Sequence, residues 1–159
     1  MKNLSVSRLV KLAVVTASYV ALTLALSSLS YGNIQFRIAE ALMLLCFYRK
    51  DYSISLTLGC LLANIFSTIG IVDVVFGTAA TVLAVICMMY SPNIYVASIF
   101  PVIFNGLIVG AELYWFVGLP FWISALEVAA GEFVCVCVLG IIIFKLLEKN
   151  QKFMKLLTD

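Results

Sequence analysis

The chain has 159 residues, of which 64% are hydrophobic and 11% are charged, and its formal net charge is +2. Its mean hydropathy is +1.15, and soluble domains carry about 25% charged residues. These values exclude a soluble globular domain and give no reason to expect nucleic-acid binding. They predict an integral membrane protein, and the length allows one domain of about six spans of ~20 residues each.

Six apolar segments, separated by turn-forming or charged residues, follow one another along the chain. They cover about 8–30, 38–48, 53–67, 71–90, 95–117 and 120–146, and a basic amphipathic tail, 147–159, follows them. The breaks include YGN, SPN and GLP, which favour turns. The second and third segments are short for a ~30 Å hydrocarbon core. We therefore expect an all-α membrane protein with six transmembrane helices, forming a single domain over residues 1–159.

Lysine and arginine are divided unevenly between the two sides that these segments imply. With the N-terminus inside, the inner side holds nine basic residues: Lys2, Arg8, Lys11, Arg49, Lys50, Lys145, Lys149, Lys152 and Lys155. The outer side holds Arg37. Because cytoplasmic loops are rich in Lys and Arg, we expect both termini in the cytoplasm and the stretch 31–37 outside. The tail then lies at the inner membrane surface and anchors the last helix, with partner binding as the alternative.

Polar side chains inside the apolar segments are the main functional signal. Ionisable groups in a bilayer cost several kcal/mol and tend to face a protein interior or a wet cavity. Asn105 and Glu112 are seven residues apart and therefore share one helix face. Glu127 and Glu132 are five apart, so they point about 140° away from each other. This set of acids and amides, with few cations, favours a ligand that is rich in hydrogen-bond donors.

Three of the polar and aromatic residues have a structural reading beside the functional one. Asp73 closely follows STIG and either caps the fourth helix or binds a ligand. Glu40 lies three residues after Arg37 and either pairs with it or contacts a ligand. Trp115 belongs either to an interfacial aromatic belt or to a surface that stacks on a flat heterocycle.

The first segment carries alanines at every fourth position, Ala13, Ala17, Ala21 and Ala25. Small side chains in such a row allow another helix to approach closely in a membrane, so we expect a docking face there. The chain has no His, no nucleotide-binding G-x-x-x-x-G-K-[ST] loop and no H-E-x-x-H motif. Its five cysteines form no C-x-x-C pair. We therefore expect neither an enzyme nor a metal or cofactor site.

Several ordered blocks resemble a known family. They are YGNIQFRIAEALMLL, LTLGCLLANIFSTIGIVDVVFGTAAT, PVIFNGLIVGAELYW and ALEVAAGEFVCVCVLG. Together these blocks are similar to the QueT family over about residues 12–147. QueT proteins are substrate-binding components, called S components, of energy-coupling factor (ECF) transporters.

The resemblance implies a six-helix S-component bundle in a bacterial plasma membrane. It implies capture of queuosine precursors, 7-deazaguanine bases such as preQ0, preQ1 or queuine, for ATP-driven uptake. The implied partners are a transmembrane coupling subunit, on which Ala13, Ala17 and Ala21 would dock, and two ATP-binding-cassette ATPases. The alternatives are an S component for another small nutrient, such as a vitamin, and a stand-alone small secondary transporter.

For a deazaguanine we expect residues 31–37 to close over the site and Glu112 and Glu132 to supply the main carboxylates. Asn105 and Asn64 would be their amide partners, with Glu127 behind them. The full set of expected substrate-binding residues is Asn33, Gln35, Arg37, Glu40, Asn64, Asp73, Asn105, Glu112, Trp115 and Glu132.

Overall fold

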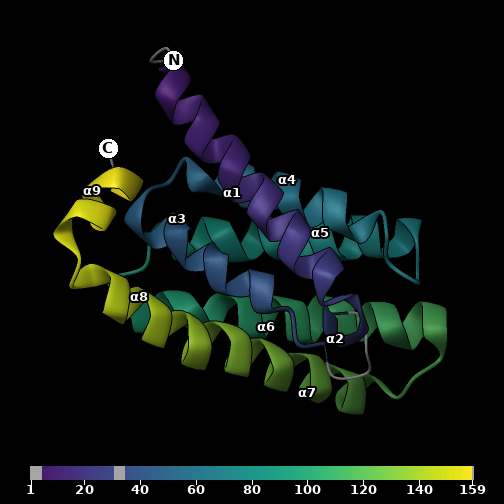
Figure 1. Ribbon diagram of the computed structural model, residues 1–159. Helices are drawn as coiled ribbons and strands as arrows, with labels where there is room; N and C mark the ends of the chain where they lie inside the picture. The colour runs from purple at the N-terminus through teal and green to yellow at the C-terminus, as the bar shows by residue number, and fades with distance from the viewer. Residues whose placement is uncertain (1–4, 31–34, 159) are drawn as a thin grey trace.

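The structure is a computed structural model that describes residues 5–30 and 35–158 (Figure 1). Within these ranges all regular secondary structure is helical. Four helical stretches are long and apolar enough to cross a membrane: Val6–Ala25, Ile71–Met88, Ile94–Val117 and Phe121–Glu148. Two apolar helices, Ile38–Tyr48 and Tyr52–Asn64, are shorter. The chain is thus a helical, multi-pass membrane protein, as its hydropathy predicts.

The first predicted helix, 8–30, is divided in the structure. Helix α1 (Val6–Ala25) begins where the Ser5 hydroxyl accepts a hydrogen bond from the backbone N–H of Arg8 at 3.3 Å, and this bond satisfies one of the free donors at a helix start. Leu26 leaves helical geometry, with ψ at 33°, and a short helix α2 (Ser27–Ser30) follows. Serine hydroxyls compete for backbone hydrogen bonds, which favours a break beside Ser27.

The short second segment is the centre of the bundle. It consists of a 3₁₀ helix, η1 (Ile38–Leu44), which continues into α3 (Leu45–Tyr48). It packs against α1 and α4 (Tyr52–Asn64) on one side and against α6 (Ile94–Glu112) and the segment η3 (Phe133–Gly140) on the other, as Figure 1 shows. Met43 and Leu44 have no exposed surface. Apart from Glu40, every residue of η1 is apolar, as expected of an element that is buried on all sides.

The longest helices of the second half pack closely on each other. Helix α5 (Ile71–Met88) precedes α6 (Ile94–Glu112), which Asn93 caps by accepting a hydrogen bond from the Val96 N–H at 2.9 Å. Helix α7 (Phe121–Glu132) lies against α6. A Cβ added at Gly110 would lie 2.8 Å from the Cα and Cβ of Ala125, so the absence of a side chain there allows the two backbones to approach.

Two segments of the second half are π-helical, with wider turns than an α-helix. The segment η2 (Leu113–Val117) extends α6, and η3 (Phe133–Gly140) joins α7 to α8 (Ile141–Glu148). The last element, α9 (Gln151–Thr158), returns to the start of α1. Figure 1 shows α9, in yellow, at the same end of the bundle as the beginning of α1, in purple.

Candidate functional site

A buried ion pair joins the segment before η1 to the first turn of α5. Nη2 of Arg37 lies 3.3 Å from Oδ2 and 3.5 Å from Oδ1 of Asp73. Both side chains are almost completely buried. Asp73 does not cap α5, because Gly70 occupies the N-cap position. The capping interpretation of Asp73 is therefore wrong, and its carboxylate faces the interior of the bundle.

The neighbouring carboxylate, Glu40, has a different partner from the one its spacing suggests. The hydroxyl of Tyr19, on α1, donates a hydrogen bond to Oε1 of Glu40. The predicted local pairing of Glu40 with Arg37 is replaced by this contact between α1 and η1. Oε2 of Glu40 has no hydrogen-bond partner among the described residues. Tyr19 was missed in the sequence because a single tyrosine in an apolar helix gives no distinct signal.

An amide on α4 fixes the start of α5. Nδ2 of Asn64 donates to the main-chain oxygen of Asp73 at 3.1 Å and to Sγ of Cys60 at 3.3 Å. A Cβ at Gly77 would lie 2.6 Å from Nδ2 of Asn64 and 2.8 Å from Oδ1 of Asp73. Gly77 therefore leaves room for this contact. Oδ1 of Asn64 is buried without a partner in the described part of the chain.

Asn105 and Glu132 form a second buried polar pair, between α6 and the end of α7. Nδ2 of Asn105 donates to Oε1 of Glu132 at 3.0 Å, and both residues are 1% exposed. Oδ1 of Asn105 and Oε2 of Glu132 remain without partners within the described ranges. Glu127, on the same helix as Glu132, is half-buried, in agreement with the different direction that its spacing predicts.

Glu112, the last residue of α6, is the most unusual group of the site. Its side chain is 0% exposed, and neither carboxylate oxygen has a hydrogen-bond partner among the described residues. Asp73 and Arg37 lie within electrostatic range of it. A buried polar group that is left without a partner costs about 1–3 kcal/mol, and more when it is charged. Glu112 therefore has unused capacity to accept hydrogen bonds from a bound molecule.

These contacts bring the polar residues of different helices into one cluster around Arg37. Its guanidinium lies within electrostatic range of each of the buried carboxylates Glu40, Asp73, Glu112 and Glu132. In the described part of the chain, acids thus outnumber cations in the cluster. The oxygens without partners belong to Glu40, Asn64, Asn105, Glu112 and Glu132. Such a set of acceptors suits a ligand that presents several N–H groups or a positive charge.

The segment that leads into the cluster packs directly on α7. Gln35 is 5% exposed, and a Cβ added at Gly131 would collide with the main-chain atoms of Gln35, lying 2.9 Å from its carbonyl carbon. Gly131 therefore allows residues 35–37 to approach Glu132. The predicted site residue Asn33, on the proposed lid at 31–37, lies outside the described residues.

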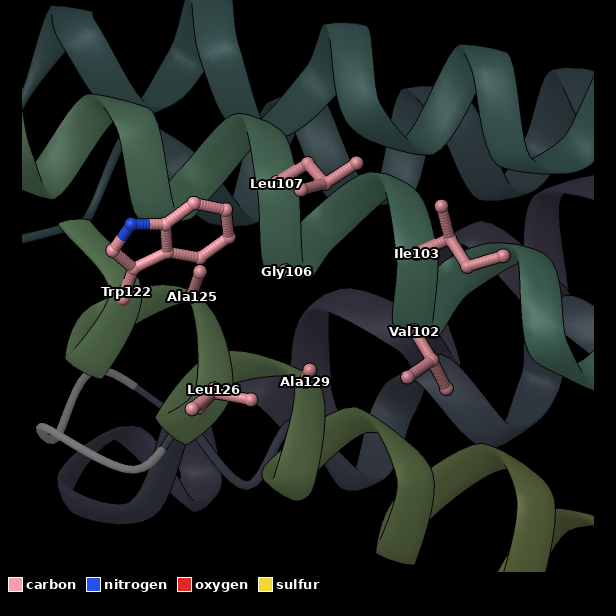
Figure 2. Close-up of a pocket in the computed structure, with 8 residues that line it drawn as sticks. All are labelled: Val102, Ile103, Gly106, Leu107, Trp122, Ala125, Leu126 and Ala129. Atoms are coloured by element: carbon pink, nitrogen blue, oxygen red, sulfur yellow. The ribbon is translucent and has the colours of Figure 1, made fainter.

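The structure does not bring the predicted site residue Trp115 into the cluster. Trp115 is 65% exposed, and its ring makes an edge contact with Phe76, with centroids 6.3 Å apart. A separate groove of about 280 Å³ lies between α6 and α7. Figure 2 shows its lining residues, with Trp122 at one end and Val102 and Ile103 at the other. All of the residues that line this groove are apolar, so its chemistry differs from that of the polar cluster.

The alanine row of α1 lines an open groove on the surface of the bundle. Ala13, Ala17 and Ala21 are exposed and form one wall. Leu58 and Leu62 of α4 form part of the other, and the groove has a volume of about 560 Å³. The row thus presents small side chains outward, as a docking face requires.

Comparisons with known proteins agree with the sequence resemblance. A family model described as QueT transporter matches residues 9–149. The curated protein "Queuosine precursor transporter QueT" of Lactococcus lactis subsp. cremoris (strain MG1363) is 42% identical over 83 residues, which are 51% of this chain and 48% of that protein. The match therefore spans about half the length of the relative. No solved structure matches the chain.

Proposed function

The chain belongs to the QueT transporter family, and on that premise we propose that it is the substrate-binding component of an importer for queuosine precursors. The proposed ligands are 7-deazaguanine bases. In this proposal the chain captures the base from outside the cell and releases it inside when partner ATPases hydrolyse ATP. The bias of Lys and Arg toward one side supports an orientation with both termini in the cytoplasm.

The observation that carries this proposal is the buried carboxylate of Glu112, which lacks any hydrogen-bond partner in the described structure. A deazaguanine presents ring N–H groups and an exocyclic amine, and one carboxylate can accept hydrogen bonds from both. Its carbonyl oxygen needs a donor, which the guanidinium of Arg37 or the amide of Gln35 would supply. A ligand with an aminomethyl cation would gain further from a second carboxylate, Glu132.

The other members of the cluster would complete or position the site. Asn105 would hold Glu132 in place through their 3.0 Å hydrogen bond. Asp73 would orient Arg37 and neutralise part of its charge, and Asn64 would fix the backbone of Asp73. Glu40 retains one free acceptor oxygen beside Arg37. Direct contacts from Asn33 and from the exposed Trp115 stay predictions.

The energy for uptake would come from an ECF module, consisting of a transmembrane coupling subunit and two ATP-binding-cassette ATPases. The exposed alanine row supports docking on that subunit because its small side chains permit close helix contact. Ala17 lies in the middle of the row. We expect Ala17→Trp to abolish ATP-dependent uptake while substrate affinity stays unchanged. Ala130→Trp, at an exposed alanine on α7, is the matched control and should leave uptake intact.

A binding experiment separates the proposed substrate from its rivals. Purified protein in detergent would be titrated by calorimetry with preQ0, preQ1, queuine, guanine and several vitamins. Selective binding of a deazaguanine is the expected result. Selective binding of a vitamin would retain the S-component mechanism and overturn the substrate. Uptake in vesicles that lack the coupling subunit and ATPases would instead favour a stand-alone secondary transporter.

A further inference from the structure

The C-terminal helix α9 is fastened to the start of α1 by the buried side chain of Arg8. Nε and Nη2 of Arg8 each lie 2.6 Å from a carboxylate oxygen of Asp51. Nη1 donates to the hydroxyl of Tyr52 and to the main-chain oxygen of Leu157, both at 3.1 Å. The Tyr52 hydroxyl also donates to that oxygen, at 2.9 Å. Arg8 therefore joins α1, the start of α4 and the last turn of α9.

This contact explains why so short a helix has a fixed place. An isolated helix of fewer than about 12 residues is marginal in water, and the carbonyls of its last turn lack partners within the helix. Arg8 supplies both a donor and a positive charge to that turn, where the helix dipole is negative. The position of α9 on the bundle is thus determined by a buried, charged contact.

An apolar groove of about 280 Å³ lies between α9 and the first turns of α1. Its walls are formed on one side by Val10 and Val14, which are 56% and 57% exposed, and on the other by Phe153 and Leu156. In a membrane protein, exposed aliphatic side chains at a helix end face the acyl chains of lipids. The dimensions and apolar walls of this groove suit one such chain.

The rim of the groove carries positive charge that no described acidic side chain neutralises. Lys11 lines the groove, and Lys152 lies one turn before Leu156 on the same side of α9. In the described part of the chain neither lysine has an ion pair. The two described acids at this end are already engaged, because Asp51 pairs with Arg8 and Arg49, and Glu148 pairs with Lys145.

We propose that this groove is a binding site for one anionic phospholipid. An acyl chain lies against Val10, Val14 and Leu156, and the phosphate lies between Lys11 and Lys152. Charge and shape both favour this occupant, since apolar walls with a basic rim fit a lipid that combines a hydrocarbon chain with a negative headgroup. The site is separate from the polar cluster around Arg37 and does not depend on which substrate that cluster binds.

Native mass spectrometry of the detergent-purified chain tests the proposal. The protein would be mixed with equal amounts of phosphatidylglycerol and phosphatidylcholine, and the ratio of the two lipid adducts measured. We expect one phosphatidylglycerol to be retained preferentially. Removing a lysine at a membrane surface weakens anionic lipid binding roughly fivefold, so the double variant Lys11→Gln/Lys152→Gln should lower the ratio about 25-fold.

Two matched controls separate a site from general attraction. The double variant Lys50→Gln/Lys145→Gln also removes two positive charges. These two lysines already have partners, since Lys50 lies over the ring of Tyr90 and Lys145 pairs with Glu148. It should keep the preference. Val14→Trp fills the groove without a change of charge and should lose the lipid, whereas Ile54→Trp fills a groove of similar size between α4 and α5 and should not.

Three outcomes would overturn the proposal. The first is a wild-type protein that binds the two lipids equally. The second is an equal loss of preference in the two lysine double variants, which would mean nonspecific charge attraction. The third is a Val14→Trp protein that retains phosphatidylglycerol as the wild type does. Gel filtration of each variant confirms that a lost adduct does not result from misfolding.

Discussion

Replacing Glu112 by Gln is expected to weaken substrate binding and, at the same time, to stabilise the empty protein. The substitution keeps the size of the side chain and removes its charge. In the empty protein this charge is fully buried, has no hydrogen-bond donor among the described residues and lies near Asp73. Removing it relieves an unfavourable desolvation and a repulsion from Asp73, which together outweigh the lost attraction to Arg37. With substrate bound, the same charge is the proposed acceptor for N–H donors.

The two effects have different magnitudes. Hydrogen bonds to a charged group contribute about 1.5–3 kcal/mol and those between neutral groups about 0.5–1.5 kcal/mol. For two donors the loss is about 2–3 kcal/mol, which corresponds to an affinity weaker by about 30-fold to 150-fold. In the empty protein the gain is about 1–3 kcal/mol. A chain of this length shifts its melting temperature by about 2–4 °C for each kcal/mol, so an increase of several degrees is expected.

Calorimetry with the preferred deazaguanine and thermal unfolding without ligand measure the two effects on the same preparation. Glu127→Gln is the control, because it makes the same chemical change on a half-buried residue of α7. It should alter neither quantity appreciably. A Glu112→Gln protein that binds substrate as the wild type does, or that melts at a lower temperature without ligand, would refute the assigned role of Glu112.

Three other predictions concern the backbone contact beside the polar cluster around Arg37 and the contacts of Arg8 with Asp51 and α9. Gly131→Ala should displace the main chain of Gln35 and weaken substrate binding about tenfold or more by calorimetry, and unchanged affinity would show that this approach is unimportant. Arg8→Gln should destabilise the protein by about 2–3 kcal/mol in thermal unfolding and expose α9 to proteolysis. The substitution leaves Asp51 without its main donor and leaves the Leu157 carbonyl with the Tyr52 hydroxyl alone. The control Arg49→Gln should cost less than about 1 kcal/mol, because that side chain is 33% exposed.

The hydrogen bonds from Arg8 keep the pKa of Asp51 below its ordinary value of 3.8, so their stabilisation is complete above that value and is lost as the pH falls toward the lowered pKa. Between about pH 5 and pH 3 the wild type should therefore lose more stability than Arg8→Gln, and equal losses would contradict this role of Asp51.

Much of the helical architecture follows from the sequence because hydropathy and turn chemistry are local. Asn93, in the predicted break SPN, caps α6 as a residue of its type does at a helix start. The spacing of Asn105 and Glu112 predicts a common face, and both side chains are buried. The blocks that resemble the QueT family predict the membership that the family model supports over residues 9–149.

The partners of the polar groups are not predictable in the same way. Spacing along the chain offered an Arg37–Glu40 pair and an Asp73 cap as the structural alternatives to ligand contact. The structure instead pairs Arg37 with Asp73 and Glu40 with Tyr19. These contacts join residues that are 36 and 21 positions apart. Packing around the central η1 segment decides them, and no periodicity within one helix contains that information.

The helix geometry beside the two main carboxylates is also absent from the sequence pattern, and it bears on function. Glu112 is followed at once by the π-helical segment Leu113–Val117, and Glu132 by the π-helical segment Phe133–Gly140. π-helical turns are rare and occur frequently at functional sites. The wider turn changes the direction in which the following side chains point. The residues after Glu112 and Glu132 can therefore face lipid although the two acids face the interior. A π-helical turn follows the buried acid in both places. Each helix can thus direct a carboxylate inward while its apolar side chains stay toward the membrane.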